Sequence, residues 1–182
     1  MSKLRRKTRE TDVLIDLRGG SGEADCRTGE PFLDHMLVTL ARYAGLDLQV
    51  EASGDLIHHL IEDVAITLGA ALRDLTPAES ARYGNAVLPM DDALVQVALD
   101  NGGRAFYEGP LPDRHYDHFL RSLADNAAMT LHVVVLRGSD RHHIVEAAFK
   151  ALGLALRQAL RGGDDDTVFS TKGAVQLERL ED

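Results

Sequence analysis

One histidine motif occurs twice in this chain, and its recurrence constrains the fold more than any other feature. The first copy begins at His58 and reads HHLIEDVAITLGAALRDL, and the second begins at His142 and reads HHIVEAAFKALGLALRQAL. The two copies are 84 positions apart, and their glutamates, glycines and several leucines and alanines coincide at that offset. Self-similarity at a fixed spacing is the signature of repeated structural units. We therefore predict a tandem duplication, with a first repeat half at 1–78 and a second at 79–182, together forming one enzyme domain.

The same repetition extends upstream of the motif. Asp34-His35 matches Asp117-His118 at an offset of 83. Apolar periodicity and turn residues predict two strands, a helix, a strand and a helix in each half. This is an α+β fold made of two ββαβα halves, each a sheet packed on two helices. The predicted elements are strands 12–17 and 24–27, helix 32–44, strand 46–52 and helix 58–75, then strands 93–100 and 104–107, helix 117–127, strand 129–136 and helix 142–160.

The HHxxE pattern suggests metal binding. On a helix, residues four apart share a face, whereas adjacent residues point about 100° apart. His58 and Glu62 can therefore bind one ion while His59 points toward another. Imidazole and carboxylate ligands suit manganese, iron or zinc. The second copy repeats the arrangement with His142, His143 and Glu146.

Two more histidines complete the predicted ligand set. His35 lies one turn into the first predicted helix, and His132 lies on the polar face of a predicted strand. Six histidines and two glutamates divide evenly between two metals, and an octahedral ion would keep two open positions, as catalytic sites do. The alternative is that the histidine pairs cap helices and the glutamates are solvated i,i+4 partners. Two copies in register favour metal binding, whereas His115 and His118 are predicted to have a surface or helix-start role.

Composition excludes several classes of protein. The net charge is −9, and broad nucleic-acid binding requires a basic surface. The single cysteine, Cys26, rules out a disulfide framework within one chain and fits a reducing cytosol. Apolar runs are interrupted by charges, so no bilayer-spanning segment is expected, and the N-terminus does not resemble a secretory signal. We expect a cytoplasmic protein without a nucleic-acid or membrane partner.

Several segments together resemble the imidazoleglycerol-phosphate dehydratase family of histidine biosynthesis. The resemblance runs from about residue 5 to 175, and the paired HHxxE motifs with FLDHM and STKG are its most specific part. The segments are RKTRETDV (6–13), FLDHML (32–37), HHLIED (58–63), RYG (82–84), PMDDA (89–93), NAAMTLHV (126–133), HHIVEAAFKAL (142–152) and STKG (170–173).

The resemblance implies a fold, a reaction and an assembly. The fold would be a duplicated half of the ribosomal protein S5 domain 2-like type. The enzyme would be a lyase that removes water from imidazole glycerol phosphate to give imidazole acetol phosphate, with two Mn²⁺ per active site and no organic cofactor. Family members form homo-oligomeric cages of 24 subunits with shared active sites. Two ions held by similar motifs suit an imidazole ring, which has nitrogen donors on opposite edges, and would stabilise charge during loss of the hydroxyl.

The resemblance also assigns residue roles. Glu10, Glu62 and Glu146 would be catalytic, Glu10 by proton transfer at the glycerol chain. The metal ligands would be His35, His58, His59, Glu62, His132, His142, His143 and Glu146. Glu10 would contact the substrate, and the phosphate site, which extends into a C-terminal tail, would comprise Arg82, Arg104, Lys150, Ser170 and Lys172. Guanidinium, ammonium and hydroxyl donors suit a phosphate monoester.

The chain departs from the family pattern in its loops. The segment GDLIHH (54–59) lacks the usual acidic pair before the first motif, Thr39 replaces a glutamine, and the connection between Arg104 and Asp117 is short. Two alternatives therefore accompany the dehydratase. One is a dinuclear metal hydrolase for another small phosphate, and the other is a non-catalytic metal-binding cage protein.

Overall fold

Two successive sets of elements have the same order in the computed structural model, which describes residues 1–77 and 79–162. The first set is β1 (Ser2–Lys7), β2 (Thr11–Gly19), β3 (Ala24–Arg27), α1 (Pro31–Ala44), β4 (Leu46–Gly54) and α2 (Ile57–Leu75). The second is β5 (Tyr83–Met90), β6 (Ala93–Asp100), β7 (Phe106–Glu108), α3 (Arg114–Ala127), β8 (Thr130–Arg137) and α4 (Arg141–Ala159). The predicted duplicated α+β fold is confirmed, and each half begins with one strand more than the sequence indicated.

The additional strands, β1 and β5, lie at edges of the two sheets and carry weak sequence signals. In β1 the sequence SKLRRK has almost no apolar alternation, and the strand is held by antiparallel pairing with β2 and by charge pairs such as Arg5 with Asp12. Strand β5 pairs with β6 and contains Pro89, a residue that sheets accept mainly at an edge. Neither strand has the two-sided burial that gives a clear sequence signal.

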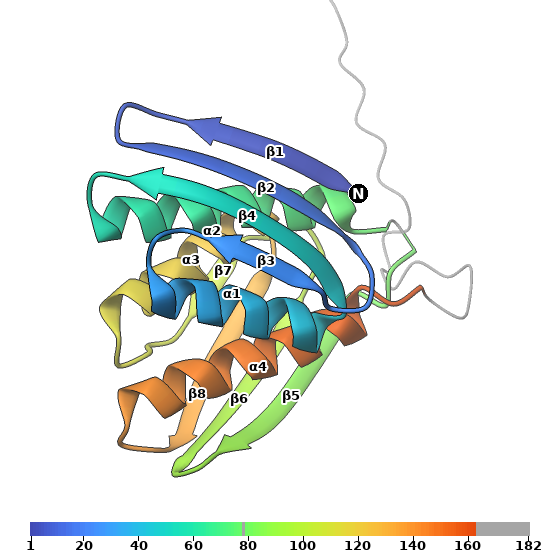
Figure 1. Cartoon of the computed structure of the whole chain (residues 1–182). Coiled ribbons are helices and arrows are strands. Elements are labelled where there is room, and N and C mark those ends of the chain that lie inside the picture. The colour runs from blue at the N-terminus through green and yellow to red at the C-terminus, as the bar shows by residue number, and fades with distance from the viewer. Residues whose placement is uncertain (78, 163–182) are drawn as a thin grey trace, which may run out of the picture.

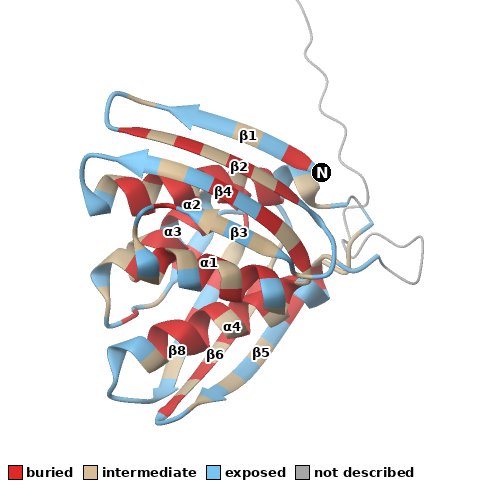
Figure 2. Cartoon of the chain, viewed as in Figure 1, coloured by how far each residue is buried: buried red, intermediate tan, exposed pale blue. Residues whose placement is uncertain are grey.

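The two sheets have matching topology and enclose the helices. Their strand orders are β1-β2-β4-β3 and β5-β6-β8-β7, and in each the last pair is parallel while the others are antiparallel. The four helices lie between the sheets, so the molecule has three layers (Figure 1). Alternate strand residues such as Val13, Ile15 and Leu17 face this helical layer and are buried, while their neighbours face outward (Figure 2).

The helices pack across the halves. Helix α1 of the first half packs against α4 of the second, and α2 packs against α3. Two glycines at equivalent positions permit these close approaches: a Cβ on Gly69 would lie 2.6 Å from the carbonyl oxygen of Leu123, and one on Gly153 would lie 2.9 Å from that of Leu40. The repeated glycine therefore has a packing role, and it brings each HHxxE helix beside a helix of the other half.

Capping residues in the sequence account for several helix ends. Gly45 ends α1 in the left-handed conformation, with φ of 69°, as its position after the apolar stripe predicts. Asp113 and Asp140 cap α3 and α4 by accepting backbone N–H groups. None of the helices in the described part of the chain is both long and apolar enough to cross a membrane.

Candidate active site

The first cluster of potential metal ligands joins α1 to α4. Oε2 of Glu146 lies 3.2 Å from Nε2 of His142 and 3.5 Å from Nε2 of His35. Glu146 is buried, and burial would raise its pKa, but the hydrogen bond and charge of Lys150 together with His35 outweigh burial and lower it. The carboxylate is therefore ionised, as a ligand must be, and two imidazoles at the surface face it.

The second cluster joins α2 to α3 in the same way. Oε2 of Glu62 lies 3.8 Å from Nε2 of His58, and Oε1 lies 3.3 Å from Nε2 of His118. The rings of His58 and His118 are stacked with centroids 5.0 Å apart. Nε2 of His118 is buried and makes no hydrogen bond. A buried ring nitrogen that faces a carboxylate without bonding it fits a metal ligand.

His118 joins a candidate cluster although the sequence did not single it out as a ligand. Its predicted surface or helix-start role does not agree with its position beside Glu62 in the second cluster. The signal was present, because the repeat offset of 83 aligns His118 with His35, which had been identified as a ligand candidate. The structure gives the two residues equivalent places, each on the shorter helix of one half and facing the HHxxE glutamate of the other half.

The second histidine of each motif bonds an aspartate outside the two clusters. Nδ1 of His59 lies 2.8 Å from Oδ1 of Asp55, and Nδ1 of His143 lies 2.8 Å from Oδ1 of Asp92. These hydrogen bonds are the main cause of a raised pKa at both histidines. Carboxylates that bond Nδ1 fix the orientation of an imidazole and direct Nε2 outward, which is a common arrangement behind metal-ligating histidines.

Glu10 belongs to the group around His59. Its Oε2 lies 3.6 Å from Nδ1 of His59, and its side chain is 56% exposed in the turn between β1 and β2. The first-half motif and the TRET segment, far apart in sequence, are thus brought together at one end of the molecule.

His132 lies apart from both clusters. It is exposed on the outer face of β8, with its ring centroid 5.4 Å from that of Phe106. Within the described residues of one chain, none of the groups of potential metal ligands includes it.

The predicted phosphate residues separate into two places. Arg82 binds Asp100 through two hydrogen bonds of 2.6 and 2.8 Å, and the more exposed Arg104 lies 3.5 Å from the same carboxylate. Arg82 is the main cause of a lowered pKa at Asp100. Lys150 instead lies 2.9 Å from Oε1 of Glu146. Ser170 and Lys172 lie outside the described residues.

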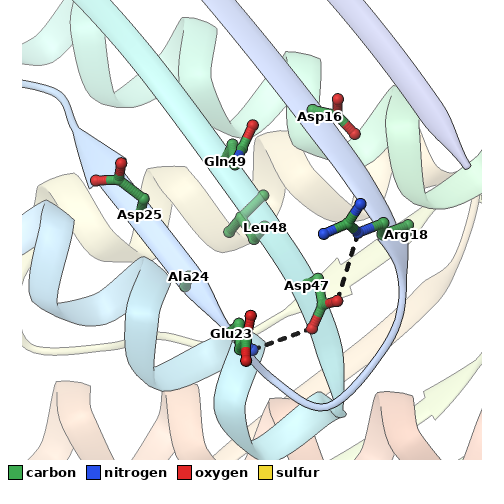
Figure 3. Close-up of a pocket in the computed structure, with 8 residues that line it drawn as sticks. All are labelled: Asp16, Arg18, Glu23, Ala24, Asp25, Asp47, Leu48 and Gln49. Carbon is green, nitrogen blue, oxygen red and sulfur yellow. Dashed lines mark hydrogen bonds and ion pairs between the residues drawn. The ribbon is translucent and has the colours of Figure 1, made fainter.

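A pocket on the outer face of the first sheet does not belong to this site. It is lined by residues of β2, β3 and β4 and by the loop that precedes β3 (Figure 3). Its central carboxylate, Asp47, accepts the backbone N–H groups of Ser21, Gly22 and Glu23 and pairs with Arg18. Asp47 therefore has a structural role in ordering this loop.

The donor chemistry of the two clusters fits a transition metal. Each cluster brings two imidazoles and one carboxylate within 4.8 Å of one another. Nitrogen and oxygen donors of this kind suit manganese, iron or zinc, and three protein donors leave coordination positions for further ligands.

Comparison with known proteins agrees with this geometry. The family model for imidazoleglycerol-phosphate dehydratase matches residues 28–156, more than half of the chain. The chain belongs to the imidazoleglycerol-phosphate dehydratase family. Among its relatives, the imidazoleglycerol-phosphate dehydratase of Pyrobaculum aerophilum is 48% identical over 93% of this chain and 97% of its own length. That of Desulforudis audaxviator is 44% identical, over 96% of this chain and 97% of its own.

Solved structures show the same fold. The crystal structure of IGPD from Pyrococcus furiosus has a TM-score of 0.84 and 42% identity, covering 94% of this chain and all of that one. The imidazoleglycerol-phosphate dehydratase of Staphylococcus aureus has a TM-score of 0.80 and 31% identity, covering 88% and 98% of the two chains. Membership of the imidazoleglycerol-phosphate dehydratase family makes this protein an enzyme, a hydro-lyase of histidine biosynthesis. The family is metal-dependent, and the two clusters supply suitable ligands.

Proposed function

We propose that this enzyme removes water from imidazole glycerol phosphate to give imidazole acetol phosphate, with two Mn²⁺ ions and no organic cofactor. The observation that carries the proposal is the pair of equivalent clusters, each built from two histidines and one glutamate across the two halves. An imidazole ring has two nitrogen donors on opposite edges, so two similar metal sites suit this substrate. When bound, the ions would act as Lewis acids that stabilise charge on the substrate.

Five of the eight ligands proposed from the sequence lie in the two clusters, and His118 is added to the proposed set. His35, His142 and Glu146 hold one ion, and His58, Glu62 and His118 hold the other. His59, His132 and His143 lie outside these two clusters. In our proposal they complete the sites of neighbouring subunits, in a cage of 24 subunits with shared active sites.

Glu10 is proposed as the group that moves the proton. Its carboxylate is exposed beside His59, so a substrate bound to the metals can reach it. Glu10 accepts a proton from one carbon of the glycerol chain while the hydroxyl group on the adjacent carbon departs, and Glu10 returns that proton to the departing hydroxide to form water. The enol that remains tautomerises to the ketone. The proton and the hydroxide that leave the substrate together account for the dehydration. In this proposal Glu62 and Glu146 act as metal ligands within the catalytic centre.

The phosphate group is proposed to bind Arg82, Arg104, Lys150, Ser170 and Lys172, of which the two arginines lie beside Asp100 and Lys150 lies beside Glu146. Asp100 holds the guanidinium of Arg82 in a fixed plane and leaves Arg104, with 76% of its side chain exposed, to contact the phosphate. A local cationic cluster allows a chain of charge −9 to bind an anionic substrate. A cytoplasmic location and a boundary between halves at 78/79 are part of the same proposal.

The direct test is turnover. Protein loaded with Mn²⁺ should convert imidazole glycerol phosphate to imidazole acetol phosphate and should restore growth of a histidine auxotroph that lacks the dehydratase. The Glu10→Gln variant should keep its metal and lose activity, whereas Glu51→Gln, an exposed change on β4, should match the parent. Release of inorganic phosphate without the ketone product would instead identify a hydrolase.

A further inference from the structure

A polar network connects α2 to the first two strands and is not part of the metal clusters. Asp63, only 8% exposed, follows Glu62 in α2. Its Oδ1 accepts a hydrogen bond of 2.8 Å from Nε of Arg6 on β1, and its Oδ2 accepts one from the hydroxyl of Thr11 on β2. One buried carboxylate thus fixes both strands of the first hairpin against the helix that carries Glu62.

The network continues into the turn that carries Glu10. The hydroxyls of Thr8 and Thr11 are 3.0 Å apart, and Thr8 donates because Thr11 already donates to Asp63. Oγ1 of Thr8 also accepts the backbone N–H of Glu10 at 3.1 Å and that of Thr11 at 3.0 Å. The carbonyl of Glu10 accepts the N–H of Asp55 at 3.0 Å. The backbone of Glu10 is therefore bonded on both sides, through contacts that lead to Asp63.

Among the described residues of the second half, the positions equivalent to Arg6, Thr11 and Asp63 form no such network, although the fold is the same. Arg6 pairs with Val13, the third residue of β2, and Leu88 pairs with Val95, the third residue of β6. Leu88 therefore takes the place of Arg6. The first residues of these two strands are Thr11 and Ala93, and the offset of 84 aligns Asp63 with Ala147. The equivalents of Arg6, Thr11 and Asp63 are Leu88, Ala93 and Ala147, all apolar.

The comparison of the two halves shows whether the fold itself requires the Arg6–Thr11–Asp63 network. The second half forms the same hairpin and packs its strands on α4 with apolar side chains at these three positions, so the fold does not require the buried Asp63 network. A buried ion pair gains little over well-packed apolar residues, because burying the charges offsets their attraction.

Both turns present carboxylates to the second histidine of a motif, but they are held differently. Asp92, in the second-half turn, bonds His143 and is itself held by the backbone N–H groups of Ser139 and Asp140. Glu10, in the first-half turn, faces His59, and its backbone is held through Thr8 and Thr11.

We propose that Asp63 is a positioning residue that holds the β1–β2 turn against α2 and so fixes Glu10 relative to the metal ligands. The role rests on the proposed function of Glu10 in proton transfer. Asp63 does not touch the substrate. It acts through Thr11 and Thr8 on the backbone of Glu10, and because α2 carries both Asp63 and Glu62, it couples the proton acceptor to the ligand helix.

The test uses the full chain loaded with Mn²⁺ and two kinds of variant. Asp63→Asn should lower kcat by about 10- to 100-fold and leave KM within about threefold, because a misplaced acid–base group affects the chemical step. The triple variant Arg6→Leu, Thr11→Ala and Asp63→Ala copies the second half. It should keep the Tm, metal content and assembly of the parent while losing a similar part of kcat. Asp12→Asn, which breaks an exposed Arg5–Asp12 pair on the same hairpin, is the matched control and should keep full activity.

A double-mutant cycle separates positioning from general damage. In a Glu10→Gln background, Asp63→Asn should change the residual kcat by less than about twofold, because its effect passes through Glu10. Additive losses would overturn the proposal, as would a triple variant that loses Tm, metal or assembly together with activity. Unchanged kcat in Asp63→Asn would also overturn it.

Amide hydrogen exchange does not depend on turnover, so it tests the role of Asp63 separately from the proposed function. Asp63→Asn should accelerate amide hydrogen exchange at Glu10 and Thr11, the two amides bonded to Thr8, while exchange in β6 stays unchanged. If the parent does not convert imidazole glycerol phosphate, the proposed function fails and the exchange measurement alone decides whether Asp63 holds the turn. Equal exchange in parent and variant would reject positioning.

Discussion

Nε2 of His35 lies 3.5 Å from Oε2 of Glu146, so a helix of the first half supplies a donor to the motif of the second. The reverse relationship holds between His118 and Glu62, at 3.3 Å. Neither half contains a complete cluster, because α1 packs on α4 and α2 on α3. The duplication therefore creates the two candidate metal sites only when both halves fold together.

Neutralising either motif glutamate should remove metal. We expect Glu62→Gln and Glu146→Gln each to lower both metal content and activity sharply, because an amide is a poor substitute for a carboxylate ligand. Glu146→Gln also leaves Lys150 without its 2.9 Å partner. Metal per chain after dialysis, measured by elemental analysis, checks this, with Glu51→Gln as the unaffected control. Full occupancy in either variant would contradict the two-cluster site.

His118 should bind metal and His115 should not. His118→Phe should weaken the affinity for one of the two ions by at least about tenfold, since even residues behind a ligand contribute that much. His115→Phe changes an exposed ring on the same helix and should leave both affinities unchanged. Competition with a metal-sensitive dye measures both. Equal metal affinities in the two variants would show that His118 is not a ligand.

Arg104 should contribute to phosphate binding. Its side chain is exposed, and its nearest acidic group, Asp100, is already bonded twice by Arg82. Arg104→Ala should weaken substrate binding by about 1–3 kcal/mol, the usual cost of losing a hydrogen bond to a charged group. Steady-state KM and direct binding of a substrate analogue provide the measurement. An unchanged KM would remove Arg104 from the site.

The metal-free protein should lose stability as the pH rises through neutrality. The hydrogen bond to Asp92, with Asp140 and Asp91 nearby, raises the pKa of His143 above its ordinary 6.5. A raised pKa means that protonated His143 stabilises the fold, fully below about pH 6.5 and progressively less as the pH passes the folded-state pKa. The difference in Tm between the parent and Asp92→Asn, measured with chelator present, should therefore shrink from pH 6 to about pH 8. A difference that grows over this range would contradict the assignment.

Removing the metal should dissociate the assembly. Three proposed ligands, His59, His132 and His143, lie outside the two clusters. In our proposal they bind ions of neighbouring subunits, so the ions would bridge subunits and stabilise the oligomer by mass action. Chelator at neutral pH should convert a large particle to smaller species, and added Mn²⁺ should restore it. Lowering the pH toward about 5 should act similarly, because protonated imidazole cannot bind metal. Light scattering that finds one size throughout would reject shared sites.

The local order of the chain could be predicted from its sequence. Apolar periodicity and turn residues located the four helices and six of the eight described strands, and Gly45 marked the end of α1. The i,i+4 spacing of His58 and Glu62 placed these two side chains within 3.8 Å of each other on one helical turn. The strands β1 and β5 were missed because their residues lack the alternation of buried and half-buried positions that β2 and β6 show.

Which side chains meet across different helices and strands could be learned only from the tertiary structure. Spacing along one helix cannot specify which other helix packs beside it, and that contact pairs His118 with Glu62 and His35 with Glu146. The same limit applies to Arg6 and Asp63, which meet only after β1 has paired with β2 and packed on α2. Sequence therefore determined which donors each helix presents, because backbone geometry repeats within a turn. Only the packing between the halves, closed by the contacts at Gly69 and Gly153, decided which donors form a site.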